Sequence, residues 1–209
     1  MQRVDWYFDF ISPFAYLARH RLAEIERRAA VQYQPVLFAG ILGHWEHKGP
    51  AEIAPKRSYS YRYLQWLADK RALPFRMPSA HPFNPLPYLR LCIALDNEPA
   101  VVRGIFDFLW QRGLDPGDTA TFDSLCSELG VTDGAARIAR DAVKQRLKDN
   151  TRRALDCDVF GVPTFAVNAE LFWGFDAIDF LLDYLDDPAL MQSEAMQQAS
   201  RVAIGVRRV

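Results

Sequence analysis

Apolar and polar residues alternate at the start of the chain, and the period then changes. Over residues 4–10 every second residue is apolar or aromatic, with Asp5, Tyr7 and Asp9 between them, which is the pattern of a strand with one buried face. Over residues 14–29 apolar residues recur at helical spacing. Ser12 stands at the cap position, and Pro13 stands where the missing N–H of proline costs nothing. The pattern predicts a strand and a helix joined at Ser12-Pro13.

Helical patterns dominate the middle of the chain. A second strand is predicted over residues 31–38, and the glycine- and proline-rich residues 39–55 are predicted to form a loop. A proline-rich break over residues 73–87 separates one helix from four later ones. These predicted helices cover residues 56–70, 87–96, 99–112, 122–129 and 133–155.

Strand character returns near the C-terminus, where residues 163–173 read as two short strands around a tight turn and predict a hairpin. Asp176 is predicted to cap a final helix, with Asp179 completing an acidic capping box. Phe175 and Phe180 hold the positions of a hydrophobic staple. The tail that follows is interpreted either as a helix at a partner surface or as a frayed end.

The order of these elements predicts the fold class. A strand–helix–strand unit begins the chain and a hairpin with a helix closes it, so these parts form one small mixed sheet covered by helices. We therefore expect an α/β protein whose sheet domain comprises residues 1–39 and 156–187. An all-helical domain over residues 40–155 is inserted between its halves, and a tail covers residues 188–209.

Composition and charge narrow the functional classes. Half of the 209 residues are hydrophobic and the net charge is −1, so the chain has no overall attraction to nucleic acid or to an anionic membrane. No apolar run approaches the roughly 18 residues that a membrane-spanning helix needs. Arg3 and Asp5 stand where a signal peptide would be apolar. We expect a cytoplasmic protein that binds neither nucleic acid nor a membrane.

The cysteines do not suggest a disulfide framework. There are three of them, and no Cys-x-x-Cys occurs. Cys92 and Cys126 fall in helical patterns and are expected in the core. Cys157 precedes one of the motifs described below, and its role stays open.

The Ser12-Pro13 junction has two interpretations. The simpler one is that Ser12 only caps the helix. The other follows from the unpaired N–H groups and partial positive charge of a helix N-terminus. An anion such as a thiolate is stabilised there, with a serine hydroxyl as donor. Asp9, just before the junction, is expected to have a hydrogen-bonded structural role rather than to tune the site.

Two other clusters receive structural interpretations. His44 and His47 lie in a predicted loop without a convincing third ligand, so no metal site is expected. Tyr59, Tyr61 and Tyr63 stand near arginines, but their spacing is helical and the chain is not basic. They are therefore interpreted as parts of a helix rather than as a nucleic-acid site.

Three motifs, taken in order, resemble one known family. They are FDFISPF over residues 8–14, FGVPTF over residues 160–165 and FWGFD over residues 172–176. With an insertion of suitable size between the first two, they resemble the 2-hydroxychromene-2-carboxylate isomerases, which belong with the kappa-class glutathione transferases. The resemblance covers about residues 3–186 and implies a thioredoxin-like fold with a large helical insertion.

The resemblance implies that glutathione is the cofactor and that Ser12 hydrogen-bonds its sulfur. A thiol with the reference pKa of about 8.5 is mostly protonated at neutral pH, so a helix N-terminus and a hydroxyl donor would favour the thiolate. Relatives that form disulfides carry Cys-x-x-Cys at this helix start. Here the sequence over residues 12–15 is Ser-Pro-Phe-Ala, which excludes thiol–disulfide exchange through that site.

The resemblance also implies binding residues for the rest of glutathione. Val162-Pro163 resembles the cis-proline turn of thioredoxin folds, with an ordinary trans proline as the alternative. The amides of residues 173–176 would bind the γ-glutamyl carboxylate and Asp176 its ammonium, unless Asp176 is only a cap. Lys56 would meet the glycine carboxylate. The implied glutathione ligands are Ser12, Lys56, Val162, Pro163, Trp173, Gly174, Phe175 and Asp176.

The substrate pocket is the part that the resemblance defines least. Phe83 and Asn84 are assigned to the pocket for an aromatic substrate. His47, which stands where kappa-class relatives have asparagine, is assigned to the same pocket. A core aromatic or a solvated side chain is the alternative for each of these residues.

The resemblance thus implies a glutathione-dependent isomerase that interconverts 2-hydroxychromene-2-carboxylate and trans-o-hydroxybenzylidenepyruvate. The bound thiolate would add to the conjugated carbon of the ring-opened substrate, allow rotation, and leave again. The alternatives are a kappa-class glutathione transferase that conjugates small electrophiles and a non-catalytic thioredoxin-fold binding protein. The expected partners are a small aromatic carboxylate and a second copy of the chain in a homodimer. The sequence does not identify the natural substrate.

Overall fold

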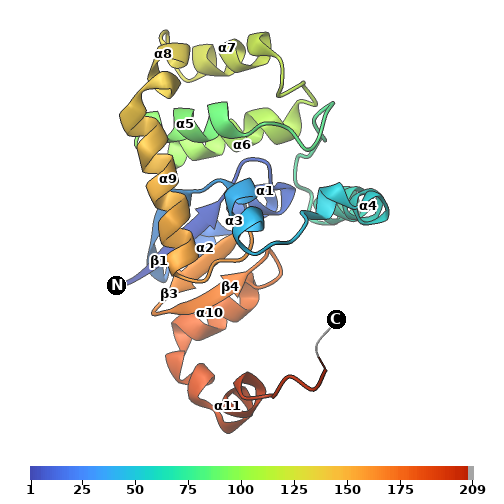
Figure 1. Ribbon diagram of the computed structural model, residues 1–209, viewed down its shortest axis with the longest axis vertical. Coiled ribbons are helices and arrows are strands. Elements are labelled where there is room, and N and C mark those ends of the chain that lie inside the picture. Colours follow the sequence, from blue (N-terminus) through green and yellow to red (C-terminus); the bar gives the residue numbers. More distant parts are fainter. Residues whose placement is uncertain (207–209) are drawn as a thin grey trace.

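A four-stranded mixed sheet lies at the centre of the fold. A computed structural model of the chain describes residues 1–206 (Figure 1). The strands are β1 (Gln2–Phe8), β2 (Ala29–Pro35), β3 (Thr164–Val167) and β4 (Glu170–Trp173). Their order is β2-β1-β3-β4; β1 is parallel to β2 and antiparallel to β3, and β3 is antiparallel to β4. Arg207 and Arg208, the basic end of the predicted tail, lie outside the described residues.

Helices surround this sheet and fill the interval between β2 and β3. α1 (Pro13–Arg19) and α2 (Leu22–Glu26) connect β1 to β2, and α10 (Ile178–Asp186), η2 (Pro188–Gln192) and α11 (Glu194–Ser200) follow β4. The helices of the interval are α3 (Phe38–His44), η1 (Pro50–Glu52), α4 (Ala54–Lys70), α5 (Leu86–Ala94), α6 (Pro99–Gln111), α7 (Thr119–Glu128), α8 (Gly134–Ala139) and α9 (Asp141–Asp156). The predicted class, a thioredoxin-like α/β fold with a large helical insertion, is confirmed.

The insertion and the sheet share one hydrophobic core. Trp6 and Phe8 lie on one face of β1, Phe10 follows the strand two residues later, and all three are fully buried. Phe106 of α6 packs on them, with its ring centroid 6.0, 5.6 and 4.6 Å from theirs, respectively. Aromatic pairs at such distances contribute about 0.5–1.5 kcal/mol beyond area burial. α6 therefore anchors the insertion at the end of β1.

The first helix and the second strand differ from their predicted bounds. The predicted helix over residues 14–29 is two helices, because the N–H groups of His20 and Arg21 bond to carbonyls three residues back and end α1. β2 begins at Ala29, because its parallel pairing with β1 places Ala29 opposite Gln2. The strand therefore begins and ends earlier than predicted.

Residues 39–55, predicted as a loop, include most of α3 and all of η1. Gly40 permits close packing of α3 on α9, since a Cβ at this position would lie 3.3 Å from the Thr151 methyl group. This is a long-range contact that glycine-rich composition does not reveal. The predicted helix over residues 133–155 is also divided, because the backbone of Arg140 is extended between α8 and α9.

The predicted cap of the last helix is wrong. α10 begins at Ile178, and no side chain caps it. Asp176 precedes the helix, and Asp179 pairs with Arg21 at 2.6 Å instead of completing a capping box. Phe175 and Phe180 therefore do not hold the staple positions on either side of the helix start. Asp179 therefore forms an ion pair with Arg21, directly before α2, and does not take part in capping α10.

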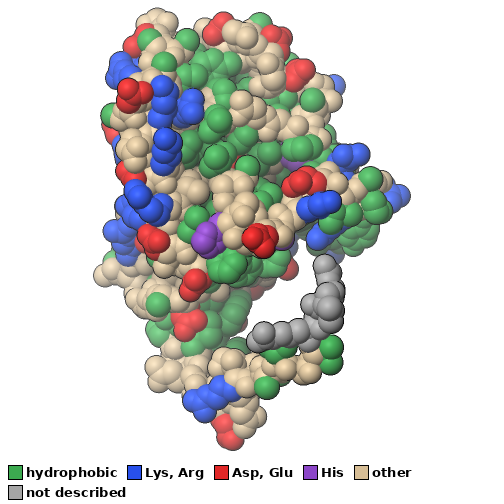
Figure 2. All heavy atoms as spheres, viewed as in Figure 1, with side chains coloured by type: hydrophobic (Ala, Val, Ile, Leu, Met, Phe, Trp, Pro, Cys, Tyr) green, Lys and Arg blue, Asp and Glu red, His purple; other side chains and the backbone are tan. Residues whose placement is uncertain are grey.

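α4 extends to one side of the sheet and carries exposed aromatic side chains. Tyr59, Tyr63 and Trp66 are exposed and stack along the helix, with successive ring centroids 6.1 and 5.7 Å apart. Leu64 and Leu67 face the core. Hydrophobic and basic side chains gather over this helix in Figure 2. The helical interpretation of the tyrosine cluster is confirmed.

Candidate active site

Ser12 lies at the N-terminus of α1 and caps it. Its Oγ accepts from the Ala15 N–H at 3.2 Å, and its own N–H donates to the Asp9 carbonyl at 3.0 Å. Pro13 is the first helical residue, and Ser12 is only 7% exposed. The predicted cap and helix start at Ser12-Pro13 are therefore confirmed, whereas the strand ends at Phe8 and residues 9–12 form a turn between it and the helix.

Ser12 also contacts the second motif, which lies far along the chain. Its Oγ donates to the Val162 carbonyl at 3.4 Å, and the Val162–Pro163 peptide bond is cis, as predicted. The Gly174 N–H donates to the Pro163 carbonyl at 2.8 Å. The structure therefore brings residues of all three sequence motifs together.

The third motif packs tightly against the second. Trp173 is 53% exposed, and its indole lies over Gly161, where a Cβ would come within 2.5 Å of Nε1. Gly174 has φ of +100°, and a Cβ there would lie 2.5 Å from Asp176 Oδ1. Glycine adopts such a φ without the steric penalty of other residues. The Asp176 side chain therefore folds back over Gly174.

α4 has a basic residue near each of its ends. Lys56 is exposed in its first turn. Arg71, just after its end, places its guanidinium 4.8 Å from the ring centroid of the buried Phe175, a cation–π distance. Phe14 of α1 contacts α4 through Tyr63, with ring centroids 6.5 Å apart. Arg71 was not predicted from the sequence, because nothing local links it to the third motif.

The three residues predicted to line the substrate pocket lie on two separate segments, before η1 and before α5. His47 is exposed beyond the end of α3. Phe83 is buried and packs on Trp110, with ring centroids 6.3 Å apart. Asn84 Oδ1 accepts from the Leu86 N–H at 3.1 Å. Phe83 therefore contributes to the core, and Asn84 holds the start of α5.

Asp9 is fully buried directly before the turn that leads to Ser12. Its carboxyl oxygens accept from the N–H groups of Ile11 at 3.1 Å and Phe38 at 2.9 Å. Burial raises the pKa of Asp9 to about 7, although these donors favour the ionised form. Asp9 is hydrogen-bonded as predicted, and it ties the turn to α3.

Two residues of the insertion, both missed by the sequence analysis, hold the carbonyls of this turn. Trp110 Nε1 donates to the Phe10 carbonyl at 3.0 Å. His81 Nε2 lies 2.8 Å from the Ile11 carbonyl. The partners are 100 and 70 residues apart in sequence, so no local pattern could link them.

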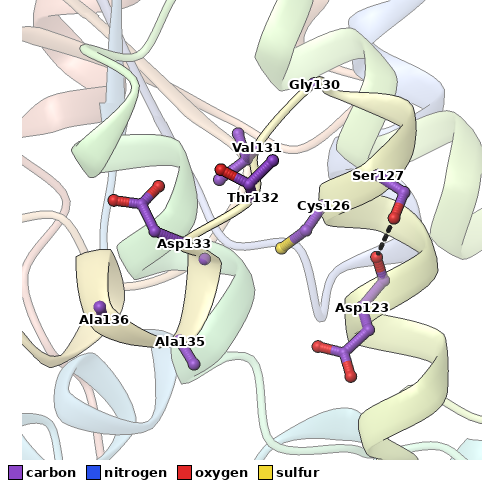
Figure 3. Close-up of a pocket in the computed structure, with 10 residues that line it drawn as sticks. Asp123, Cys126, Ser127, Gly130, Val131, Thr132, Asp133, Ala135 and Ala136 are labelled. Carbon is purple, nitrogen blue, oxygen red and sulfur yellow. Dashed lines mark hydrogen bonds between the residues drawn. The ribbon is translucent and has the colours of Figure 1, made fainter.

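Two cavities in the described structure lie away from Ser12. The larger, about 790 Å³, lies between α7 and α8, with Cys126 among its lining residues (Figure 3). The other, about 460 Å³, borders β2 and includes Arg146. Cys92 and Cys126 are buried, as predicted, and Cys157 is exposed.

Within residues 1–206, no helix combines the length and apolar character needed to cross a bilayer. The same residues contain no group of three or more His, Cys, Asp or Glu side chains placed to hold a metal ion.

Comparisons with known proteins agree with this geometry. The family model of the DSBA-like thioredoxin domain matches residues 3–186. The 2-hydroxychromene-2-carboxylate isomerase of Sphingobium xenophagum is 30% identical over 195 residues, which cover 88% of this chain and 98% of the relative. Glutathione S-transferase kappa 2 of Caenorhabditis elegans is 26% identical over 210 residues, which cover 88% of this chain and 92% of the relative.

A solved structure of a 2-hydroxychromene-2-carboxylate isomerase has the same fold. Its TM-score is 0.77 at 24% identity, and the match covers 96% of this chain and 100% of that chain. The sheet and the helical insertion thus agree with matches over most of the sequence. The chain belongs to the DSBA-like thioredoxin-domain family and, within it, to the 2-hydroxychromene-2-carboxylate isomerases, enzymes related to the kappa-class glutathione transferases.

Proposed function

We propose that this protein is a glutathione-dependent isomerase that interconverts 2-hydroxychromene-2-carboxylate and trans-o-hydroxybenzylidenepyruvate. The main support is the contact between the Ser12 hydroxyl and the Val162 carbonyl at 3.4 Å, which places a helix N-terminus beside a cis-proline turn. A serine at this helix start supports a role other than disulfide exchange. The named isomerase relative supports the choice of reaction.

The residues at the junction fit the cysteinyl part of glutathione. In the part of the chain that the structure describes, the Val162 N–H has no hydrogen-bond partner, so this donor is available to a ligand. Among the described residues, the Val162 carbonyl accepts only a long bond from Ser12. An N–H and a C=O on one residue can pair with an extended peptide backbone. The Ser12 proton, released from Val162, can then be donated to a sulfur.

Bound glutathione would supply a thiolate nucleophile that adds to a conjugated carbon of the substrate and leaves once the former double bond has rotated. Ser12 would donate to the sulfur, and the unpaired N–H groups of α1 would add a partial positive charge. Lowering a thiol pKa by one unit takes about 1.4 kcal/mol, which one hydrogen bond to a charged group can contribute. No side-chain nucleophile is required.

The ends of glutathione are assigned by charge. Lys56 would bind the glycine carboxylate, and Asp176 would hold the γ-glutamyl ammonium. The Gly174 N–H already bonds to the Pro163 carbonyl, which leaves the amides of Phe175 and Asp176 for the γ-glutamyl carboxylate. Trp173 precedes Gly174, and its exposed indole would close the side of the site where the γ-glutamyl group binds.

The proposal extends to the substrate and its setting. A small aromatic carboxylate would bind beside the sulfur, in a pocket lined by His47, Phe83 and Asn84. The enzyme would work as a homodimer in the cytoplasm. Its sheet domain would comprise residues 1–39 and 156–187, with residues 40–155 as the inserted helical domain.

Titration calorimetry with glutathione tests the cofactor. We expect saturable binding of one glutathione per chain. S-methylglutathione, which keeps the peptide backbone but cannot form a thiolate, should bind without supporting turnover. An absence of glutathione binding would contradict the proposal and favour a non-catalytic binding protein.

Product analysis tests the reaction. Incubation with trans-o-hydroxybenzylidenepyruvate should yield 2-hydroxychromene-2-carboxylate, with glutathione recovered unchanged. Stoichiometric consumption of glutathione would instead show a transferase, which the kappa-class relative makes the second candidate.

A further inference from the structure

His81 connects the turn before Ser12 to α4. Its Nε2 lies 2.8 Å from the Ile11 carbonyl, and its Nδ1 lies 2.5 Å from the Tyr61 hydroxyl. Ile11 directly precedes Ser12, and Tyr61 is on the helix that carries Lys56. The ring therefore has one partner in the Ser12 turn and the other on α4.

The partners of His81 determine its tautomer. A backbone carbonyl can only accept, so Nε2 must carry a proton. In a neutral imidazole Nδ1 is then an acceptor, and the Tyr61 hydroxyl must donate to it. Burial lowers the pKa of His81, which favours the neutral ring. The Ile11 carbonyl therefore selects the Nε2–H tautomer, and Tyr61 supports it as a donor to Nδ1; the same hydroxyl also lies 3.0 Å from the His81 carbonyl.

Packing fixes the ring as well. His81 lies against Phe83 and Trp110, with ring centroids 5.9 and 5.6 Å away. Trp110 itself donates to the Phe10 carbonyl at 3.0 Å. Two adjacent carbonyls of the turn are thus held by two side chains that pack on each other.

We propose that His81 is a positioning residue for the Ser12 hydroxyl: the neutral ring, oriented by Tyr61, holds the Ile11 carbonyl and so sets the direction in which Ser12 donates. The long Ser12–Val162 bond of 3.4 Å makes this direction important, because a small displacement would remove the donor from its acceptor. The inference rests on the proposed function, since Ser12 is taken to donate to the glutathione sulfur.

Variants at both ends of the connection test this role. His81→Phe keeps a ring of similar size and loses both hydrogen bonds, whereas His81→Gln keeps an N–H donor toward Ile11. Tyr61→Phe removes only the hydroxyl. Tyr63→Phe is the matched control, because Tyr63 lies on the same helix and makes no hydrogen bond to His81 within the described residues.

The readouts are kcat, the KM for glutathione, and the apparent pKa of the bound thiol from its ultraviolet thiolate absorbance. His81→Phe should lower kcat by about tenfold to a hundredfold and raise the thiol pKa by about one unit, with little change in KM. His81→Gln should recover most of kcat. Tyr61→Phe should have a smaller effect of the same kind, and Tyr63→Phe none.

Nitrogen NMR of His81 tests the tautomer without glutathione, and hydrogen exchange of the Ser12 amide tests the turn. We expect the Nε2–H form, and faster exchange in His81→Phe than in Tyr63→Phe. The Nδ1–H form, or wild-type exchange and wild-type thiol pKa in His81→Phe, would overturn the inference. If the wild type binds no glutathione, the proposed function fails, and these two glutathione-free measurements still decide whether His81 positions the turn.

Discussion

The Ser12 hydroxyl has two partners that use different parts of the group. Its oxygen accepts from the Ala15 N–H at 3.2 Å, while its proton is donated to the Val162 carbonyl at 3.4 Å. A hydroxyl can do both at once, so the cap is kept when the proton turns to another acceptor. Capping and anion stabilisation, which were alternatives in the sequence, are compatible at one residue.

Replacing Ser12 by alanine should reduce turnover far more than stability. The lost cap should lower the free energy of unfolding by about 1 kcal/mol, whereas the lost donor should lower kcat by about ten- to a thousandfold. Denaturant unfolding and steady-state kinetics measure the two effects.

The matched control is Ser193→Ala, because Ser193 caps α11 by accepting from the Met196 N–H at 3.4 Å. This variant should show a small loss of stability and unchanged turnover. Equal turnover in the two variants would limit Ser12 to a capping role.

Asp9 should make the protein less stable as the pH rises. Burial raises its pKa from 3.8 to about 7, so the folded protein keeps a proton that the unfolded chain releases. The free energy of unfolding should therefore fall between about pH 4 and about pH 7, by on the order of a few kcal/mol, and then level off. Denaturant unfolding across this range measures the slope.

Asp9→Asn cannot ionise and should remove this contribution to the slope. The comparison is made between slopes rather than between absolute stabilities, because asparagine cannot accept from both Ile11 and Phe38 in the same way. If the stability of Asp9→Asn fell with pH as steeply as that of the wild type, the pKa of Asp9 would not be raised in the folded protein, and the prediction would be contradicted.

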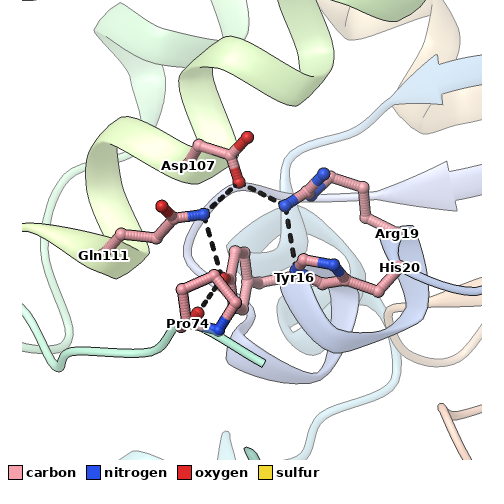
Figure 4. A network of polar contacts seen from close by, with 6 residues as sticks. All are labelled: Tyr16, Arg19, His20, Pro74, Asp107 and Gln111. Atoms are coloured by element: carbon pink, nitrogen blue, oxygen red, sulfur yellow. Dashed lines mark hydrogen bonds and ion pairs between the residues drawn. The ribbon is translucent and has the colours of Figure 1, made fainter. Parts of the chain in front are cut away.

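At the scale of elements, a polar network joins α1 to α6 (Figure 4). Arg19 pairs with Asp107, which also accepts from Gln111 at 2.5 Å. Gln111 donates to the Tyr16 hydroxyl at 3.2 Å, and that hydroxyl donates to the Pro74 carbonyl. The network therefore connects α1, which Ser12 caps, to α6, which carries Trp110.

Asp107→Ala should destabilise the protein more than removal of a comparable surface acid. The Arg19 side chain is only 11% exposed, so the variant leaves a mostly buried cation without its carboxylate, at a cost of about 2 kcal/mol. Glu128→Ala is the control, because Arg112 and Glu128 are 44% and 43% exposed, and its effect should stay within about 0.5 kcal/mol. Denaturant unfolding compares them, and equal losses would mean that Arg19 has found another partner.

At the scale of the whole molecule, the insertion holds the Ser12 turn, and the C-terminal arm over residues 188–206 does not. α3 and α6 reach the turn through Phe38 and Trp110, and the segment between α4 and α5 reaches it through His81. The arm extends beyond α10 (Figure 1), and neither η2 nor α11 contains a buried residue.

Truncation after Asp187 should therefore leave the protein folded. We expect a loss of about 1 kcal/mol in the free energy of unfolding, because Met191 is partly buried against the core, and unchanged glutathione binding. Analytical ultracentrifugation of the full and truncated chains measures the oligomeric state. A shift from dimer to monomer would assign the arm to a partner surface, an unchanged oligomeric state would assign it to a frayed end, and unfolding of the truncated chain would contradict the prediction.

Errors in the sequence analysis came from contacts between distant segments. α3 forms in a glycine-rich stretch because Gly40 fits against Thr151 of α9. Asp179 leaves the predicted capping box because Arg21 is its partner. Neither partner lies within the few residues that determine a cap or a period, so local propensity could not include them.

By itself, the sequence determined that a strand precedes Ser12 and that Ser12-Pro13 caps and begins the first helix, because alternation and capping act within one or two turns of chain. Motif order also identified the family and the cis turn. Only the tertiary structure decided that Trp110 and His81 hold the carbonyls beside Ser12. Those hydrogen bonds exist only once α6 and the segment after α4 have packed against the end of β1, and packing between distant segments has no local signature.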